Sequence, residues 1–597
     1  MKIMKRKSIK SSGKLLLRKS IQPYLDTDIS KYISHVFISI IIGLLAGGGA
    51  IVFHHVLYIT RTFFRPDNFR AKYDIPVFFI VLIPVTGAIL TSLLTWLYPS
   101  IAKEKGVISV IKAIIIRKGF IPLKETLFHF IAPIISIGTG APLGPEGPSA
   151  KIGSGIGSYM SQLFRHKSND VIMYTAAGGG AAISAVFNAP IAGVFFGIEV
   201  ILLNDLKNRA LSALIIAAVM ADILSRTVLG NHKIFVIPSY SIGDLYTYPY
   251  YILLGVLCGI ISIIYLNFSE FFKMLFNEKF KIHNPFLKLL PVALVFGFFL
   301  VYQYDLFGIG YIAINKVLQG QILPIQVLQL LILKVIFLAL FLQAGAFGGS
   351  FAPALSIGTF LGYLMAVTSN MVFNTTLDPV AFALVGMGGV LAGINSIPLT
   401  SILLVFEVTS DYNFILPLML VAIISHLAIL YHRKGNEYTL ALLDENIDVT
   451  KKGDLDIFRK MTVGSILQKD MNVVDYTAPF KEVVSIIIDA KYGDVFVVNR
   501  NKKLVGVITL KDVRQTLLDN DLCDLLIAGD LVIEIPPVDE NDPVSLAIEK
   551  IREFNVENIP VVKSAANREF IGIINHRDII ETYYKTLDDI SMSEFLL

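Results

Sequence analysis

The sequence has few of the residues on which disulfide frameworks, metal centres and enzymes commonly depend. Its 597 residues include two cysteines, Cys258 in an apolar segment and Cys523 in a polar one, which propose neither a disulfide framework nor a metal site. No Ser/His, HExxH or paired-aspartate pattern indicates an intramembrane enzyme, and the adjacent His54 and His55 are typical of packed or interfacial side chains. We therefore expect no catalytic activity, no metal and no required cofactor.

Charge is also scarce, which excludes an ordinary soluble protein. Charged residues make up 17% of the chain and hydrophobic residues 54%, and the mean hydropathy is +0.65. Uncharged runs such as residues 32–60 are long enough to cross a hydrocarbon core of about 30 Å. From about His432 onward, charges become dense and short apolar runs alternate with helical patterns. The sequence predicts a polytopic membrane domain followed by a soluble α/β tail.

Acidic residues are absent from the first twenty positions, which contain eight lysines and arginines. The positive-inside rule places this basic segment, residues 1–30, in the cytoplasm. Its apolar piece, Leu15 to Leu17, is too short for a signal-peptide core. Such charge is typical of a membrane flank, so we expect no nucleic-acid partner. We expect a multi-pass protein of the cell membrane, whose C-terminal tail also lies in the cytoplasm.

One acid, Glu146, ends a run without Asp, Glu, Lys or Arg that covers residues 126–145. It stands in the stretch GTGAPLGPEGP, residues 138–148, whose glycines and prolines cannot continue a helix. An acid at the centre of a bilayer costs about 2.5 to 3.5 kcal/mol even on conservative scales, so it is a functional candidate by default. Alternatively, residues 138–148 form a surface loop between two membrane spans, and Glu146 has no function in transport.

The membrane part is duplicated. Residues 140–157, GAPLGPEGPSAKIGSGIG, align with residues 345–362, GAFGGSFAPALSIGTFLG, at an offset of 205. A second block, Gly178 to Val200, aligns with Gly386 to Val408 at an offset of 208. Repeats with Gly/Pro-interrupted segments predict a secondary-transporter architecture with the substrate site at the repeat interface.

The two interruptions also predict the charge of the substrate. Helical patterns begin near Pro148 and Pro353, since proline suits the first turn of a helix. Two helix N-termini would converge there with unpaired N–H groups, and their partner should be an anion. Glu146 could occupy that anion site when ionised and leave it when protonated, as a gate or a proton carrier. Alternatively, it caps its own helix.

These motifs together closely resemble the CLC family of chloride channels and chloride/proton antiporters, from about residue 30 to the end. The resemblance rests on GPEGP at 144–148, GSFAP at 349–353, FNAPIAG at 187–193 and a polar tail of two repeats. It implies an all-α membrane domain of about 18 helices in two inverted repeats over residues 31–444. It also implies a homodimer in lipid, with one pore per subunit for chloride or another small anion.

The resemblance assigns roles to individual residues. Glu146 corresponds to the external gating glutamate, which competes with the permeating ion. Gly147, Ser350 and Phe351 correspond to parts of the anion site, the last two through backbone amides. Tyr438 resembles the tyrosine whose hydroxyl closes that site from the cytoplasm, although it would otherwise be interpreted as an interfacial anchor.

Two departures from the family pattern concern the anion site. The family's GSGIP segment falls at residues 104–108, EKGVI, so Lys105 and Ile108 replace a serine and a proline. Lys105, beside Gly106, would either bind the anion through its charge or extend to the cytoplasm and leave the site one ligand short. In addition, Pro145 replaces the usual basic residue before the gating glutamate.

A third departure concerns protons. Val200, next to Glu199, stands where antiporters generally carry an internal proton-relay glutamate, and valine cannot carry a proton. We therefore expect a passive chloride channel gated by Glu146. A chloride/proton antiporter and a nucleotide-sensing membrane protein that transports little are the alternatives.

The tail resembles a tandem pair of CBS modules, the first with its linker at residues 445–520 and the second at 521–597. GVITLKD and GIINHRD repeat at a spacing of 66 residues. Thr509, Asp512 and Asp578 are candidate contacts for an adenine nucleotide. Each aspartate could instead cap the helix that it opens, and Asn575 departs from the expected Ser/Thr.

Overall fold

The chain divides into two compact units, residues 1–447 and 448–597. The computed structural model describes residues 28–67, 76–103, 105–164, 166, 168–204, 208–230, 234–282, 284–433, 438–439, 442, 461–469, 471–490, 493–516, 525–554, 556–564 and 568–582. Most of the basic N-terminal segment and the expected domain limits at 444/445 and 520/521 lie outside these residues.

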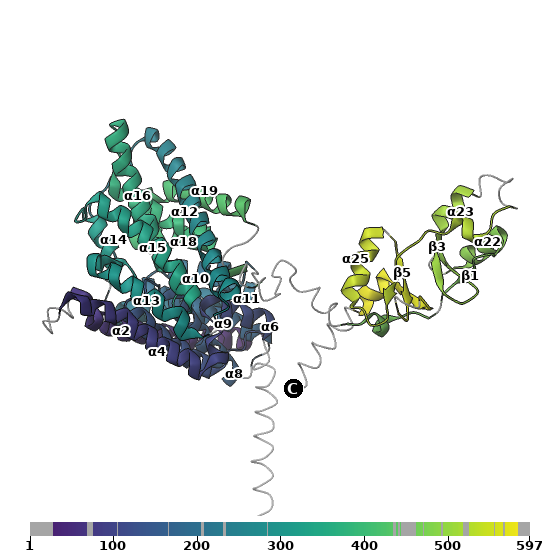
Figure 1. The fold of residues 1–597 in the computed structure, drawn as a ribbon. Coiled ribbons are helices and arrows are strands. Elements are labelled where there is room, and N and C mark those ends of the chain that lie inside the picture. Colours follow the sequence, from purple (N-terminus) through teal and green to yellow (C-terminus); the bar gives the residue numbers. More distant parts are fainter. Residues whose placement is uncertain are drawn as a thin grey trace, which may run out of the picture. The chain divides into compact units, whose positions relative to one another are not determined.

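Every regular element described in the first unit is a helix. In Figure 1 the helices of its first half, in purple and blue, lie mostly below those of its second half, in teal and green. The first half contains α2 (Asp28–Phe64), η1 (Val77–Val81), α4 (Leu82–Leu97), α5 (Pro99–Ala102), α6 (Gly106–Ile116), α7 (Leu123–Gly138), α8 (Glu146–Leu163), α9 (Ser168–Phe187), α10 (Pro190–Phe196), η2 (Gly197–Ile201) and α11 (Asn208–Leu229).

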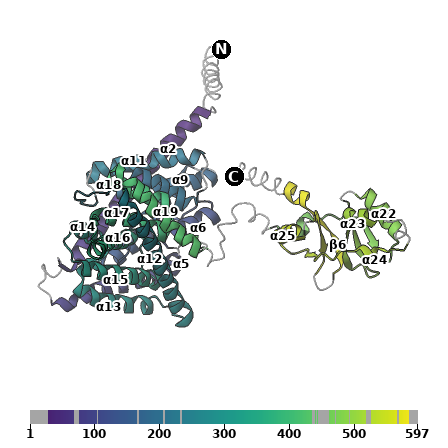
Figure 2. The same cartoon turned by 90° about the horizontal axis from the view of Figure 1, so that it is seen from above.

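The second half continues with a similar series of helices, and α16 and α17 lie side by side near the middle of the unit in Figure 2. The elements are η3 (Leu245–Thr247), α12 (Tyr248–Met274), η4 (Leu275–Lys279), α13 (Pro285–Tyr302), η5 (Tyr304–Leu306), α14 (Tyr311–Leu318), α15 (Pro324–Ala344), α16 (Phe351–Phe373), α17 (Pro379–Asn395), α18 (Pro398–Thr409), η6 (Tyr412–Phe414) and α19 (Ile415–His432).

Nine helices among the described residues are long and apolar enough to cross a membrane. Four further apolar helices, α6, α10 with η2, α17 and α18, have 10–17 residues and are shorter than a typical span of about 20 residues. In the most hydrophobic window of α9, 83% of the residues are buried, and in that of α16 72%, against 33% in α13. The helices α9 and α16 therefore lie in the interior of the unit, and α13 lies at its periphery.

Both predicted breaks are present, and each is followed by a helix. The helices begin at Glu146 and Phe351, two residues earlier than the prolines from which their starts were predicted. Pro148 and Pro353 lie in the first turn, where the missing N–H has no intrahelical acceptor, so proline does not mark the first residue.

Glycines at equivalent repeat positions let the inner helices cross closely. A Cβ on Gly153 of α8 would lie 2.2 Å from the carbonyl oxygen of Gly178 on α9. A Cβ on Gly358 of α16 would lie 2.1 Å from the carbonyl oxygen of Gly386 on α17. No other side chain fits at these contacts, so the duplicated glycines of the sequence mark the same helix crossing in each half.

The tail unit holds two three-stranded sheets with the orders β1-β2-β3 and β4-β5-β6. Each sheet has one parallel and one antiparallel pair, with a register shift at Val497/Val498 and at Val561/Val562. The elements are η8 (Val463–Ile466), β1 (Val473–Asp475), α22 (Phe480–Asp489), β2 (Asp494–Val498), β3 (Leu504–Thr509), α23 (Leu510–Thr516), α24 (Ala528–Leu531), β4 (Val538–Asp539), α25 (Val544–Phe554), β5 (Asn558–Val562) and β6 (Phe570–Asn575).

Candidate functional site

The two repeats meet at a pair of equivalent glycines. The Gly144 N–H donates to the Gly349 carbonyl at 2.8 Å, and the Gly349 N–H donates to the Gly144 carbonyl at 2.7 Å. We call this pair the glycine bridge. Each glycine lies two residues before a helix, α8 or α16, so the bridge holds two helix N-termini together. Unpaired N–H groups and the positive ends of two helix dipoles converge there, an arrangement that favours an anion.

Glu146 is the first residue of α8, and its side chain is 1% exposed. Its Oε2 accepts a hydrogen bond from the backbone N–H of Ala352, in the first turn of α16, at 3.3 Å. Its Oε1 accepts from the Tyr311 hydroxyl at 3.0 Å. The carboxylate of one repeat therefore lies at the helix N-terminus of the other, where a free anion could bind instead.

A third helix begins at the same place. Gly106 opens α6 with a φ of +49°. A Cβ built on Gly147 would lie 3.7 Å from the Gly349 Cα and 3.9 Å from the Gly106 Cα. The predicted site residues Gly106 and Gly147 thus come together with the glycine bridge. The Lys105 ammonium group lies over the Phe347 ring, 5.2 Å from its centroid, which is a cation–π contact.

A buried amide joins two of the predicted anion-site residues. Asn395, the last residue of α17, is 0% exposed. Its Oδ1 accepts hydrogen bonds from the Ser350 hydroxyl at 3.1 Å and from the Tyr438 hydroxyl at 2.9 Å. The buried Phe351 ring packs beside Ser350, with Phe187 and Phe196 as ring neighbours at 5.6 and 6.2 Å.

The sequence analysis did not single out Asn395 or Tyr311. Asn395 is the only residue of α17 whose side chain can form hydrogen bonds, and a polar residue in such an apolar helix could have drawn attention to it. Tyr311 offered no comparable signal, because it opens a short helix 165 residues from its partner Glu146.

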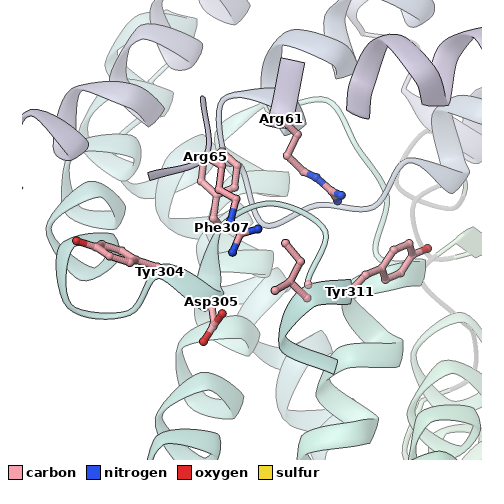
Figure 3. Close-up of a pocket in the computed structure, with 8 residues that line it drawn as sticks. Arg61, Arg65, Tyr304, Asp305, Phe307 and Tyr311 are labelled. Atoms are coloured by element: carbon pink, nitrogen blue, oxygen red, sulfur yellow. The ribbon is translucent and has the colours of Figure 1, made fainter. Parts of the chain in front are cut away.

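A pocket beside Tyr311 contains two arginines (Figure 3). It is lined by Arg61, Arg65, Tyr304, Asp305, Phe307, Gly310, Tyr311 and Ile312. Arg65 pairs with Asp67 at 2.9 Å, and Asp305 pairs with Lys316 at 2.7 Å. Within the described part of the chain, Arg61 has no carboxylate partner. The pocket therefore places positive charge on the Tyr311 side of Glu146, whereas Pro145, in the position of the family's usual basic residue, carries no charge.

Val200 is 1% exposed and lies in the π-helical turn η2. Its neighbour Glu199 accepts hydrogen bonds at the start of α18, from the N–H groups of Leu399 at 3.1 Å and Thr400 at 2.8 Å and from the Thr400 hydroxyl at 2.6 Å. This carboxylate therefore links the first repeat to a helix N-terminus of the second.

The equivalent residue of the second repeat, Glu407, makes the reciprocal contact. It accepts from the N–H groups of Ile191 at 2.9 Å and Ala192 at 2.8 Å, at the start of α10. Each repeat therefore caps a helix of the other with a partly buried carboxylate, and Glu199 makes this contact in the structure.

The candidate nucleotide contacts of the tail lie in two different environments. The Thr509 N–H and hydroxyl both donate to Asp512 Oδ2, at 2.9 and 2.6 Å, which is a capping arrangement at the start of α23. Asp578 Oδ2 is buried and has no hydrogen-bond partner among the described residues. Asn575 Nδ2 donates to Asn558, whose own Nδ2 donates to Asp494 at 2.6 Å.

The chain matches two family models. The model described as voltage gated chloride channel matches residues 86–429, which is more than half of the chain. The CBS domain model matches twice, at residues 463–519 and 528–585. The tail is therefore a tandem CBS unit.

Similar curated proteins include both channels and exchangers by name. The H(+)/Cl(-) exchange transporter ClcA of Vibrio cholerae is 30% identical over 416 residues, which cover 68% of this chain and 87% of that protein. Chloride channel protein CLC-e of Arabidopsis thaliana is 29% identical over 416 residues, which cover 64% of this chain and 57% of that protein. CLC-f of the same plant is 26% identical over 584 residues, which cover 85% of this chain and 74% of that protein.

Two solved structures support the fold. A slow cyanobacterial Cl−/H+ antiporter has a TM-score of 0.63 at 23% identity and covers 70% of this chain and 98% of its own. A eukaryotic CLC transporter also has a TM-score of 0.63, at 17% identity, and covers 92% of this chain and 99% of its own. At these identities the likeness is one of fold.

Proposed function

Because the chain belongs to the voltage gated chloride channel family, whose activity is anion transport and not enzyme chemistry, we propose that it conducts chloride passively across the membrane under the control of Glu146. The observation that carries this proposal is the Glu146 carboxylate at the N-terminus of α16, hydrogen-bonded to the Ala352 N–H. Chloride and this carboxylate compete for the same N–H groups, so displacement of Glu146 opens the site.

The proposed anion contacts are the backbone at the three helix starts and two hydroxyls. They comprise Lys105, Gly106, Gly147, Ser350, Phe351 and Tyr438, with Lys105 placed by its main chain and its ammonium over Phe347. Three positive helix ends suit a small anion and disfavour a cation, and the two hydroxyls donate to Asn395 Oδ1 in the structure.

A passive channel is favoured over an exchanger by Val200. An apolar side chain, buried at this position, offers no titratable group between Glu146 and the cytoplasm. Chloride/proton exchange is the second candidate, because the Vibrio cholerae relative carries the name of an H(+)/Cl(-) exchange transporter.

Purified protein in liposomes separates these candidates. Liposomes loaded with KCl are diluted into low chloride, and a chloride electrode and a pH electrode record both ions at once. We expect chloride efflux down its gradient with no fixed number of protons taken up. Proton movement driven uphill by chloride would establish exchange, and the absence of any flux would leave the sensing alternative.

The assembly and location that we propose are a homodimer in the cell membrane, with the N-terminus and the CBS tail in the cytoplasm. An exposed apolar stripe on α11 supports a buried contact with lipid or with a second copy, since its members recur every four residues. They are Leu211, Ile215, Val219 and Ile223. The mass of the detergent-solubilised protein, measured by light scattering, tests the dimer.

The CBS tail is proposed to bind an adenine nucleotide through Thr509, Asp512 and Asp578. Asp578 is the best supported of these contacts, since its buried Oδ2 lacks a partner among the described residues and could accept from a ribose hydroxyl. Calorimetric titration of the full chain with ATP tests this role, with Asp578→Ala as the comparison. No heat with the wild type would leave the tail with a structural role, and equal heats for both proteins would mean that Asp578 does not contact the nucleotide.

A further inference from the structure

Asn395 stands out because it is fully buried and only half satisfied. Its carbonyl oxygen accepts two hydrogen bonds, whereas its Nδ2 has no partner among the described residues. An unpaired buried N–H group is costly, and most buried polar groups avoid that cost. The two hydroxyls that it holds belong to Ser350 and Tyr438, both of which are proposed to face the anion.

The chemistry of an amide gives this residue two useful orientations. In the orientation observed, the Ser350 and Tyr438 O–H groups both point at Oδ1, so neither proton is available to an anion. A half-turn about the Cβ–Cγ bond exchanges oxygen and nitrogen with almost no change of shape. The NH2 group would then donate one hydrogen to each hydroxyl oxygen, and both O–H protons would be free to donate elsewhere.

We propose that Asn395 is a positioning residue of the anion site, whose amide orientation decides whether the Ser350 and Tyr438 hydroxyls donate to the protein or to the bound anion. Without an anion, Oδ1 holds both protons. With an anion, Nδ2 holds both oxygens and the protons turn to the negative charge. This inference rests on the proposed function, because the ligand is the anion proposed there.

The proposal also accounts for the replacement of serine by Lys105. A serine at position 105 would have supplied a hydroxyl donor, and the lysine ammonium instead lies over Phe347. Ser350, at the end of the glycine bridge, brings a hydroxyl to the site from the other repeat. The Ser350 hydroxyl has a single proton, which can be donated to the anion only when the Asn395 amide does not accept it.

The test is calorimetric titration of the purified full-length protein with KCl, for the wild type and for Asn395→Asp. A carboxylate can accept from both hydroxyls but has no N–H to donate, so it holds the protons permanently. We expect the Kd for chloride to rise at least about tenfold, which is the loss of one strong hydrogen bond. Adding Tyr438→Phe to Asn395→Asp should then change the Kd less than about twofold, although Tyr438→Phe alone weakens binding.

Asn370→Asp is the matched control, because it makes the same change at the far end of α16. Among the described residues the Asn370 side chain bonds Leu377 and Thr375, and it lies about 28 Å along the helix from Phe351. Its chloride Kd should equal that of the wild type. A wild-type Kd in Asn395→Asp, or an undiminished effect of Tyr438→Phe in that background, would overturn the proposal.

If Asn395→Asp does not fold, a double-mutant cycle at the two hydroxyls tests the proposal instead. Ser350→Ala, Tyr438→Phe and the double variant are titrated with KCl, with Asn395 intact. Because one amide orients both hydroxyls, the two effects should depart from additivity by at least about threefold, whereas independent ligands add. Additive effects would overturn the proposal. If the wild type neither binds nor moves chloride, the proposed function itself fails, which is a different outcome.

Discussion

The two repeats of the membrane unit share one framework and differ in their chemistry. In each repeat a helix starts two residues after the glycine bridge and crosses its neighbour at a glycine, and a glutamate of each repeat caps a helix of the other. Where the first repeat has Glu146, the second has Phe351. The shared features depend on backbone geometry, which is the same in both repeats. The functional carboxylate is present in one repeat only.

The largest effect is expected at the paired glycines, where both repeats should respond alike. Gly153→Ala would place a Cβ 2.2 Å from the Gly178 carbonyl, and Gly358→Ala would place one 2.1 Å from the Gly386 carbonyl. Each substitution forces two helices apart and should cost about 3 kcal/mol of folding free energy. Thermal unfolding in detergent measures this. Gly48→Ala in α2, where a Cβ would meet its nearest atom, Leu224 Cδ2, at an ordinary 3.7 Å, separates crowding from a simple loss of glycine.

Unequal effects would contradict the shared framework. If Gly358→Ala unfolded the protein while Gly153→Ala left its stability unchanged, the two crossings would not be equivalent, and the symmetry would be one of sequence only.

These glycines also explain why much of the fold could be predicted from the sequence. A close crossing or a helix break requires glycine or proline, so a duplicated framework leaves identities at a constant offset. The starts of α8 and α16 were two residues off, because proline is tolerated anywhere in the first turn. The site was harder, since the Tyr311–Glu146 contact spans 165 residues and the Asn395–Ser350 contact 45, and neither follows a local pattern.

The next largest effect is expected at the reciprocal caps. Glu199→Gln and Glu407→Gln each turn one acceptor oxygen into an NH2 group that faces a backbone N–H donor. The unpaired donor should cost about 2 kcal/mol in either repeat. Thermal unfolding in detergent and chloride flux in liposomes are measured together. We expect similar losses of stability and nearly unchanged flux for each folded molecule.

A change of flux confined to Glu199→Gln would break this equivalence. It would mean that the glutamate beside Val200 takes part in transport as well as in capping, and it would strengthen the exchange candidate. Glu270→Gln, an exposed carboxylate that pairs with Arg433, controls for the loss of a negative charge.

A smaller effect is expected where the repeats differ. Glu146→Gln keeps the shape of the side chain but removes its negative charge, so the side chain no longer competes as an anion at α16. Wild-type flux should change about tenfold between acid and neutral pH as the carboxylate gains its proton, and the variant should change less than about twofold. Liposome efflux at a series of pH values measures this. An unchanged pH profile in the variant would remove the gating role from Glu146.

The smallest effect extends the comparison to the tail, which is also duplicated. Asp494 and Asn558 are the first residues of the equivalent strands β2 and β5, and Asn558 Nδ2 donates to Asp494. Burial raises the pKa of Asp494 above its usual value, and this effect outweighs the hydrogen bond from Asn558. The folded tail therefore holds the proton more tightly than the unfolded chain does.

This direction fixes the sign of a pH effect on stability. Because the pKa of Asp494 is higher in the folded state, the tail loses stability as pH rises from the ordinary aspartate range through the raised pKa. Asp494→Asn makes the first module like the second and removes the titration, since an amide oxygen can still accept from Asn558. In a fragment of residues 448–597, the variant should unfold at a slightly higher temperature than the wild type at neutral pH, with the difference vanishing in acid. If the difference in unfolding temperature instead grew in acid, the charged carboxylate would stabilise the module, and the aspartate in place of asparagine would favour folding.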